Sequence, residues 1–241
     1  MMASQDIHSA EYVADLFDRC APSYRRWSAV SSFGFVWRWR KACVAMLPEP
    51  DGPAPEILDL MAGTGELWPH LLRRFPDATI TAVDISRQMH LIALERLHQT
   101  RAERITHLQA DILSMEIEPD IADALTASFG LKTMTPDQLT LIARFIARVL
   151  KPGASYALIE ASDPKGWGLR PLFRVYLDGV LPLVERYLLR GARDFSMIGI
   201  YTRRFGSCAA FAEALRSQGL TVTETRHMFG CATGVYGRKP Q

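Results

Sequence analysis

The strongest structural signal in this chain of 241 residues is the segment Glu56-Ile57-Leu58-Asp59-Leu60-Met61-Ala62-Gly63-Thr64-Gly65. Its short apolar run closes on an acid and is followed by small residues, a pattern typical of a buried parallel strand that ends in a tight turn before a helix. At such a turn the backbone N–H groups and the helix N-terminus can face a ligand. Glycines let the backbone approach that ligand closely and adopt unusual angles. The segment therefore predicts a strand–turn–helix unit that binds a ligand.

The next strand supplies an acid at the spacing typical of a nucleoside site. Thr79-Ile80-Thr81-Ala82-Val83-Asp84 ends in a carboxylate about 20 residues beyond the turn, where it can hold both ribose hydroxyls. A dinucleotide fingerprint needs a third glycine three positions after Gly65, and this chain has Trp68 there. The pattern favours S-adenosyl-L-methionine (SAM), which has no pyrophosphate, over NAD or FAD. The alternative is a small-residue turn in an α/β domain that binds no ligand.

Two further strand ends extend the predicted site. Ile105-Thr106-His107-Leu108-Gln109-Ala110-Asp111-Ile112 reads as a strand that ends near Asp111, which could accept a hydrogen bond from the adenine amine, and Ile112, which offers a backbone amide and an apolar wall. The segment 122–130 reads as a fourth strand that places Ser128-Phe129 near the methyl donor. Ligands of open α/β sheets bind at the carboxyl ends of the strands. We therefore expect these side chains to gather around one cleft.

Five segments carry a resemblance to a known family. They are Val13–Tyr24, Trp39-Arg40, Leu58–Leu67, Ser128–Lys132 and Arg148–Gly153. In that order they are similar to the F-D-x-I-A-x-x-Y segment, the Trp-Arg pair, L-D-L-A-x-G-T-G-D-L, S-F-G-L-R-N and R-V-L-K-P-G of the UbiE-type ubiquinone/menaquinone C-methyltransferases. These enzymes are class I SAM-dependent methyltransferases. The last segment is shared by many SAM methyltransferases and is the least specific.

The resemblance implies SAM as cofactor, S-adenosyl-L-homocysteine (SAH) as product, and a small aromatic or quinone-like acceptor. The family's SAM contacts, carried over residue by residue, fall on Thr64, Asp84, Asp111, Ile112 and Ser128. With their neighbours at the strand ends, the candidate cofactor-binding residues are Asp59, Ala62, Gly63, Thr64, Gly65, Asp84, Ile85, Asp111, Ile112, Ser128 and Phe129.

The acceptor side departs from the family pattern. The arginine and asparagine after F-G-L in the family, the first of which is implicated in deprotonating the acceptor, correspond to Lys132 and Thr133. Lysine keeps the charge but loses the planar fork of donors. The family's Y-x-Y-L segment aligns with Phe195-Ser196-Met197-Ile198, and its Y-D pair with Tyr24-Arg25. The resemblance therefore implies a UbiE-like enzyme with a diverged acceptor side.

The sequence assigns no general base. Carbon methylation of a hydroquinone-like ring is helped by removal of a hydroxyl proton, by about 10²–10⁴-fold when a base is positioned for it. The candidates are His227, Asp163, Tyr24 and Tyr201, with Lys132 as the stabiliser of a phenolate. Each could equally be structural, and a histidine on an edge strand is more often a packing residue than a base.

Three functional interpretations stay open at this point. The first is SAM-dependent methylation of a small aromatic, quinone-like or specialised-metabolite acceptor. The second, within the first, is C-methylation of a respiratory quinone. The third is a SAM-fold protein that uses the cofactor structurally, for a cyclisation or for binding without methyl transfer. The sequence does not separate methylation of carbon, oxygen and nitrogen.

Composition and charge predict a globular, cytoplasmic protein. Hydrophobic residues make up 48% of the chain and charged residues 22%, and the net charge of +2 favours no polyanionic partner. The four cysteines lack metal-ligand spacing, which predicts reduced thiols and no metal. The chain shows no signal-peptide pattern and no apolar run of the roughly 18–20 residues that span a membrane. The fourth strand lacks the Asn/Asp-Pro-Pro-Tyr/Phe run of base-modifying methyltransferases, so we expect no nucleic acid partner.

The order of strand and helix signals predicts an α/β, doubly wound, Rossmann-like fold with a seven-stranded sheet, in one domain over residues 1–241. We expect a helical cap, a SAM-binding core, a helical acceptor-side insertion, and a C-terminal helix with an antiparallel edge hairpin. These cover residues 1–50, 56–162, 163–205 and 206–241. The edge strand could support a homodimer.

Two local features of the cap lead to specific expectations. Apolar residues at helical spacing predict a first helix that ends at Pro22. The segment Phe33–Lys41 mixes aromatics with cations and could touch a membrane surface. We favour instead a helix that packs one face on the domain and keeps its arginines solvated on the other. At most peripheral membrane contact is expected.

Overall fold

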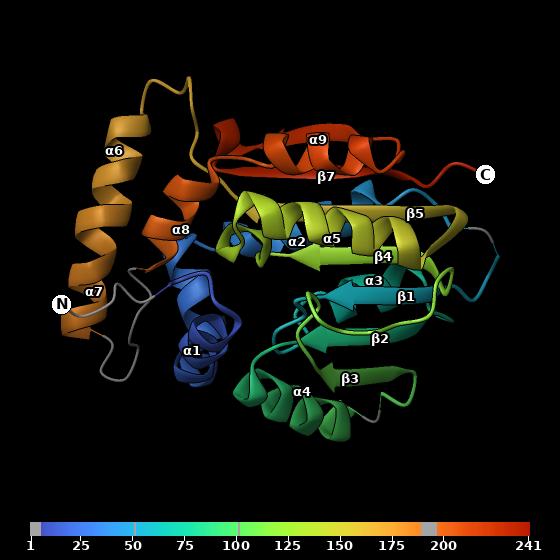
Figure 1. The fold of residues 1–241 in the computed structure, drawn as a ribbon. Helices are drawn as coiled ribbons and strands as arrows, with labels where there is room; N and C mark the ends of the chain where they lie inside the picture. Colours follow the sequence, from blue (N-terminus) through green and yellow to red (C-terminus); the bar gives the residue numbers. More distant parts are fainter. Residues whose placement is uncertain (1–5, 51, 101, 189–196) are drawn as a thin grey trace.

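A seven-stranded sheet runs through the centre of the molecule, with helices on both faces (Figure 1). The computed structural model describes residues 6–50, 52–100, 102–188 and 197–241. The strands are β1 (Glu56–Leu60), β2 (Thr79–Asp84), β3 (Ile105–Gln109), β4 (Ala122–Ser128), β5 (Leu150–Ala161), β6 (Thr223–His227) and β7 (Ala232–Arg238). Their order is β3-β2-β1-β4-β5-β7-β6, with parallel pairing from β1 to β5 and antiparallel pairing of β7 with both neighbours. The predicted sheet and its antiparallel edge hairpin are confirmed.

The helices cover the sheet because each presents an apolar stripe to it. Helices α5 (Pro136–Val149) and α9 (Ala209–Ser217) lie on one face, and α2 (Phe35–Met46) and α3 (Trp68–Arg74) on the other, while α4 (Arg87–Thr100) packs on β2 and β3. In α5 the buried residues recur at helical spacing: Leu139, Ile142, Ala143, Ile146 and Val149. Strands β1 and β4 are buried along almost their whole length, since both faces of the sheet are covered.

The strand order reverses at β1 and β4, which is where open α/β sheets bind their ligands. Strand β1 pairs with β2 on one side and with β4 on the other. The connection after β1 leads to α3 on one face, and the connection after β4 leads to α5 on the opposite face. The two connections therefore diverge and leave a crevice at the carboxyl ends of the strands.

A helical cap stands beside these strand ends, at the left of Figure 1. It consists of α1 (Ala10–Ser31), α6 (Arg170–Val175), a π-helical turn (Tyr176–Val180), α7 (Leu181–Leu188) and α8 (Met197–Phe205). Its own apolar cluster comprises Leu16, Cys20, Trp27, Leu177, Leu181 and Tyr201. The described part of the predicted insertion is thus helical from Arg170 onward, while residues 163–169 form turns and irregular structure. Phe195 and Ser196, which we aligned with the family's tyrosine segment, lie outside the described residues.

The prediction that the first helix ends at Pro22 is wrong. Helix α1 continues through this proline as far as Ser31. A proline inside a helix costs about 3 kcal/mol, because it removes one backbone hydrogen bond and crowds the preceding turn. Large apolar side chains are buried on both sides of it, including Leu16 before and Trp27 after, and burial of a large apolar side chain gains roughly 1.5–3 kcal/mol. Tertiary packing therefore outweighs the local preference.

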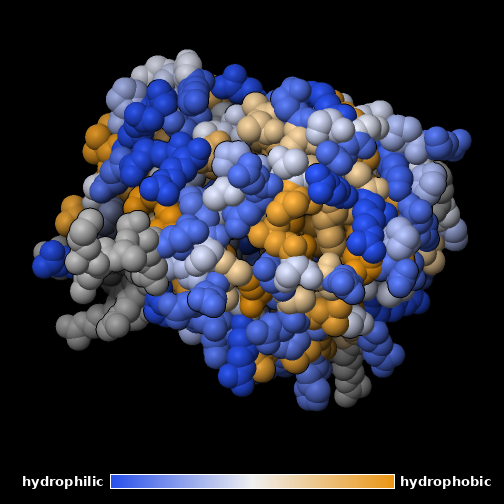
Figure 2. Space-filling model, viewed as in Figure 1, coloured by the Kyte–Doolittle hydropathy of each residue, from blue (hydrophilic) through white to orange (hydrophobic). Residues whose placement is uncertain are grey.

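Among the described residues, no helix is both long and apolar enough to cross a bilayer. Several large apolar side chains are nevertheless exposed around α6 and α7, and Figure 2 shows apolar patches there beside strongly hydrophilic ones. They are Leu169, Leu172, Val175, Val180 and Leu183. All four cysteines are buried, and none of them forms a disulfide.

Candidate functional site

A cleft lies at the carboxyl ends of β1, β2 and β4, with α1 as one wall. Eight of the candidate cofactor residues line it: Ala62, Gly63, Asp84, Ile85, Asp111, Ile112, Ser128 and Phe129. The remaining three, Asp59, Thr64 and Gly65, belong to the same strand end and turn but do not line the cleft.

Asp84 sits in the middle of the cleft, at the end of β2. Its Oδ2 accepts a hydrogen bond from the Gly63 backbone N–H at 2.7 Å, and its Oδ1 accepts one from the Ser86 backbone N–H at 2.9 Å. Burial raises the pKa of Asp84 to about 6, against the two backbone hydrogen bonds, which lower it. Each carboxylate oxygen can accept more than one hydrogen bond. The group can therefore receive a pair of neighbouring hydroxyls while it stays tied to the glycine turn.

The turn after β1 needs its glycines for two different reasons. Gly63 has φ +58° and Gly65 has φ +81°, both in the left-handed region that favours glycine. A Cβ atom at Gly65 would also lie 2.3 Å from the ring of Trp68, whereas one at Gly63 would approach nothing closer than 3.9 Å. Trp68, at the position of a dinucleotide-binding glycine, thus packs under the turn and shapes it from the protein side.

Asp59 supports this turn from the core. It is 1% exposed, and its carboxylate accepts hydrogen bonds from Trp68 Nε1 at 3.2 Å and from Thr126 Oγ1 at 2.8 Å. Burial raises its pKa to about 7, although both hydrogen bonds lower it. The Asp59 carboxylate faces the core and does not line the cleft, and its role in cofactor binding stays a prediction.

The far end of the cleft is apolar around one acid. Asp111 follows β3, and its Oδ1 accepts a hydrogen bond from the Leu113 backbone N–H at 2.9 Å. Ile112 and Met89 are buried beside it and line the same end of the cleft. Strand β3 ends at Gln109, two residues earlier than the acid. The acid is thus held in a turn, with apolar walls that suit a planar ring.

The other end is shaped by a strained bend after β4. Phe129 has φ +67°, which is rare for a residue with a side chain and costs roughly 1–3 kcal/mol. A Cβ atom at Gly130 would lie 2.3 Å from the Met61 side chain, so the two strand ends meet tightly here. The Phe129 ring has two cations near it, the Arg40 guanidinium at 5.6 Å and the Lys132 ammonium at 5.9 Å.

A second, apolar cavity of about 360 Å³ adjoins this end of the cleft. We call it the side cavity; its lining residues are Leu16, Phe17, Cys20, Tyr24, Lys132, Thr133, Met197, Ile198 and Tyr201. Phe17, Tyr24 and Thr133 line both spaces. Among the described residues of the lining, Lys132 carries the one charged side chain, and its Nζ donates to Glu160 Oε1 at 2.9 Å and to the Phe129 carbonyl at 2.8 Å.

Burial favours the protonated form of the two tyrosines Tyr24 and Tyr201 that line these spaces. Burial raises the pKa of Tyr24, and the nearby Arg40 lowers it by less. Burial likewise raises the pKa of Tyr201, whose hydroxyl donates to the Ile7 carbonyl. Both hydroxyls can donate hydrogen bonds near neutral pH, but neither is a ready base.

The remaining two candidates lie elsewhere. Asp163 binds Arg170 and Arg174, and the hydrogen bond from Arg170 lowers its pKa. His227 is on β6 and contacts the Thr225 hydroxyl. Neither residue lines the cleft or the side cavity.

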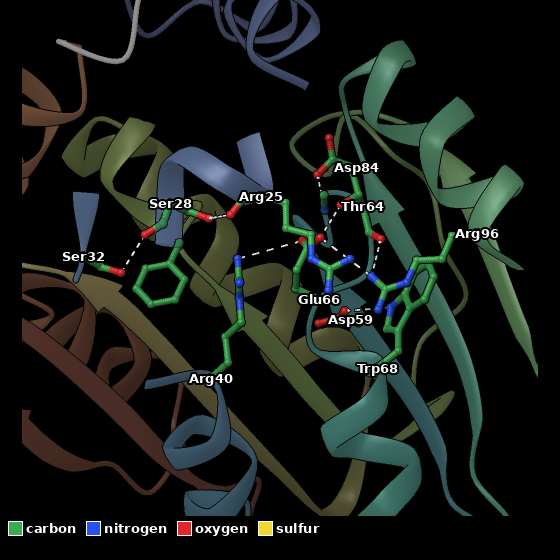
Figure 3. A network of polar contacts seen from close by, with 12 residues as sticks. Arg25, Ser28, Ser32, Arg40, Asp59, Thr64, Glu66, Trp68, Asp84 and Arg96 are labelled. Carbon is green, nitrogen blue, oxygen red and sulfur yellow. Dashed lines mark hydrogen bonds and ion pairs between the residues drawn. The ribbon is translucent and has the colours of Figure 1, made fainter. Parts of the chain in front are cut away.

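The structure brings two charged residues into the cleft that the sequence analysis did not select. Arg40 of α2 is 5% exposed, so the prediction that the arginines of this segment are solvated is wrong for it. Its Nη2 lies 3.9 Å from Oε2 of Glu66, which follows the glycine turn directly. Arg96 of α4 approaches the other side of Glu66 at 3.7 Å, and Figure 3 shows this chain of charges. The Trp-Arg pair and the acid after G-T-G were the available signals.

A pair of histidines holds the turn from a third side. His107 Nε2 lies 3.2 Å from the Gly63 carbonyl, and its Nδ1 lies 2.8 Å from His90 Nδ1. Burial lowers the pKa of His107 to about 4. The neutral ring donates from Nε2 to the carbonyl and accepts from His90. His107 is at an inward position of β3, and that alternation was the signal for its burial.

The strand order, the acids at successive strand ends and the cleft at the switch point together define a class I methyltransferase fold. The chain matches the model of the ubiE/COQ5 methyltransferase family over residues 4–239, and it belongs to that family. It is therefore an enzyme of the methyltransferase class.

Known relatives support this assignment over the full length. The chain is 29% identical to a demethylmenaquinone methyltransferase of Lactiplantibacillus plantarum over 242 residues, covering 99% of each chain. It is 33% identical to a ubiquinone/menaquinone biosynthesis C-methyltransferase UbiE of Syntrophotalea carbinolica, covering 78% of each. Among solved structures, the [4+2]-cyclase SpnF has the same fold, with a TM-score of 0.68, 15% identity and 96% of each chain covered.

Proposed function

We propose that this enzyme transfers the methyl group of SAM to a ring carbon of a small, quinol-like aromatic acceptor. The observation that carries the proposal is the side cavity, whose described lining includes one cation, Lys132, with its ammonium 5.9 Å from the ring of Phe129 in the cleft. An apolar space suits the body of such an acceptor, and the cation suits a hydroxyl that becomes anionic. The names of the relatives support a quinone-type acceptor, including a respiratory quinone.

The residues of the cleft fit SAM. The Asp84 carboxylate would accept hydrogen bonds from the two ribose hydroxyls, and Asp111 with Ile112 would bind the adenine. SAM bound in this way supplies a methyl group activated by its sulfonium for direct displacement. The bend Ser128-Phe129-Gly130 lines the cleft, with the Phe129 ring 5.9 Å from the Lys132 ammonium of the side cavity, and it would align the donor with the acceptor. Alignment of two reactants supplies a large share of the acceleration in such reactions.

Lys132 would stabilise the acceptor oxygen. Its ammonium has three donors, of which two bind Glu160 and the Phe129 carbonyl. The third can serve an oxygen in the side cavity. The Tyr24 hydroxyl, protonated because burial raises its pKa, would donate a second hydrogen bond from the wall shared by cleft and cavity. Both contacts favour the anionic form of a ring hydroxyl, whose proton would leave to water, and that form makes the ring carbon nucleophilic. The ring carbon would then bond to the methyl carbon as the bond from sulfur breaks and releases SAH, and the ring would lose its carbon-bound proton to water as it regains aromaticity.

The test uses methyl-labelled SAM. The enzyme is incubated anaerobically with a prenylated 1,4-naphthohydroquinone that has a free ring carbon, with the oxidised quinone, and with a reduced lipid extract of the source organism. We expect label on the ring carbon of the reduced compounds and none on the oxidised quinone. Asp84→Ala is the control and should lose SAM binding and labelling together. Label on oxygen, or tight SAH binding without any transfer, would contradict the proposal.

A further inference from the structure

Arg40 and Glu66 form a buried ion pair that is too long for a hydrogen bond. Their side chains are 6% and 9% exposed, and the closest nitrogen–oxygen distance is 3.9 Å. The Arg40 Nε has no hydrogen-bond partner anywhere in the described ranges. Both residues line the cleft. A buried guanidinium with an unpaired donor is costly, so the pair is incomplete as it stands.

Contacts on the outer side fix Glu66 in place. The Thr64 hydroxyl and Arg96 approach its Oε1, and Arg96 also donates to the Thr64 carbonyl at 3.0 Å. The other carboxylate oxygen of Glu66, Oε2, faces Arg40 and Gly63 (Figure 3). The Arg40 guanidinium also makes a cation–π contact with the ring of Phe129, whose centre lies 5.6 Å away. Each residue thus presents one unfilled polar edge to the cleft.

The position of the pair relative to the other cleft residues identifies its ligand. A nucleoside with its ribose on Asp84 and its adenine at Asp111 directs its 5′ substituent toward Gly63 and the bend at Phe129. Glu66 and Arg40 stand at that end. In SAM this substituent is a methionyl group, which carries one carboxylate and one ammonium. A cation and an anion held apart inside a low-dielectric cleft match such a zwitterion.

On that basis we infer that Arg40 binds the carboxylate of the SAM methionyl group and that Glu66 binds its ammonium. The inference rests on the proposed use of SAM and assigns two specificity residues to it. The guanidinium would present its fork of donors to the carboxylate, and the unpaired Nε would gain its partner. The same pair would discriminate against nucleosides that lack the amino-acid group.

The test measures affinity by isothermal titration calorimetry for three ligands. SAH carries both charges, its decarboxylated analogue carries the ammonium alone, and 5′-methylthioadenosine carries neither. Arg40→Gln should weaken SAH by roughly tenfold to a hundredfold, the usual worth of hydrogen bonds to a charged group. It should leave the other two ligands within about twofold. Glu66→Gln should weaken SAH and the decarboxylated analogue but not 5′-methylthioadenosine.

Two further variants serve as controls for this experiment. Arg38→Gln removes an exposed arginine from the same helix and should change none of the three affinities. Arg40→Lys keeps the charge and should fall between the wild type and Arg40→Gln for SAH alone. Because ligands are compared within each variant, a general loss of folding affects all three equally and is recognised by thermal melting.

The outcomes separate the two claims. Equal losses for all three ligands, or unchanged SAH affinity, would overturn the inference and leave the proposed function intact. The same holds if Arg40→Gln raises the KM of the acceptor without changing SAH affinity, since Arg40 would then serve the acceptor. Wild-type protein that binds neither SAH nor 5′-methylthioadenosine would instead overturn the proposed use of SAM.

Discussion

Asp84 combines two tasks that set opposite demands on its pKa. Burial in the cleft raises the pKa to about 6, while the Gly63 and Ser86 backbone N–H groups favour the ionised form. Ribose hydroxyls donate hydrogen bonds and so bind the ionised carboxylate. Lowering the pH through 6 protonates the group and should weaken SAH binding, approaching tenfold per pH unit below that value.

Calorimetry at pH 5, 6, 7 and 8 measures this dependence. Asp84→Asn lacks the titrating group, so it should bind SAH weakly and with a flat profile. A wild-type profile as flat as that of the variant would show that the charge of Asp84 plays no part in binding.

Burial of the Asp59 carboxyl group makes the free energy of unfolding depend on pH. Burial raises its pKa from the ordinary value of 3.8 to about 7 in the folded protein. The folded state therefore keeps its proton where the unfolded state has lost it, and the free energy of unfolding falls as the pH rises from about 4 to about 7. The loss is complete above the folded pKa and amounts to roughly 1.4 kcal/mol for each pH unit that separates the two pKa values.

Asp59→Asn removes that pH dependence while its amide can still pair with Trp68 and Thr126. We compare the melting temperature of the variant minus that of the wild type at two pH values. We expect this difference to be several degrees higher at pH 8 than at pH 5. Asp77→Asn, at an exposed site, serves as the control. An Asp59→Asn difference that is the same at both pH values would refute the assignment of a buried, protonated acid.

Between elements, one ion pair fastens the short 3₁₀ turn Leu131–Thr133 to β5. Glu160 is fully buried and accepts hydrogen bonds from both the backbone N–H and the Nζ of Lys132, at 3.1 Å and 2.9 Å. The pair positions the cation of the side cavity. Breaking a buried pair by removing one partner costs roughly 3–5 kcal/mol, because the other charge is left alone.

Lys132→Met should therefore lower the free energy of unfolding by about that amount, measured by urea denaturation. Adding Glu160→Gln should restore most of the loss, since no charge is then stranded. A matched exposed pair is Lys239 and Asp120, where Lys239→Met should cost less than about 1 kcal/mol. If the double variant is as unstable as Lys132→Met, the interaction does not work through its charges.

Across the whole molecule, the sheet and the strand-end residues that line the cleft could be predicted because their signals are local, whereas their role in cofactor binding stays a prediction. The strands are short runs rich in apolar residues, and Asp84 and Asp111 lie at or just after a strand end. The burial of Arg40 in the cleft could not be predicted from the sequence, because the aromatic and basic residues around it show no single apolar face. Asp163 and His227 lie away from the cleft for reasons of tertiary structure alone, and the same holds for the passage of α1 through Pro22.

Helix α1 forms one wall of the cleft, and hydrogen bonds connect this part of the chain to elements on both sides of the cleft. Asp18 Oδ1 accepts hydrogen bonds from the Ser86 hydroxyl and from the Gln88 backbone N–H at the start of α4. Just before α1, the His8 carbonyl accepts a hydrogen bond from Gln138 Nε2 of α5. Because His8, Val13, Phe17 and Tyr24 also line the cleft, a bound ligand touches the helix and the sheet at once. Ligand binding should therefore tie the cap to the core.

Hydrogen exchange with and without SAH measures this tie. We expect SAH to slow exchange by about tenfold or more in α1 and in the turn 61–66, in line with the stabilisation that a saturating ligand gives, and to leave β6 unchanged. In Asp18→Ala the grip of α1 on α4 is lost, so α1 should exchange faster without ligand and gain less protection from it. Asp15→Ala, an exposed acid one turn earlier on α1, is the matched control and should behave like the wild type. Equal protection of β6 and α1 would mean that SAH stabilises the protein globally, and the cap would then be no wall of the cofactor site.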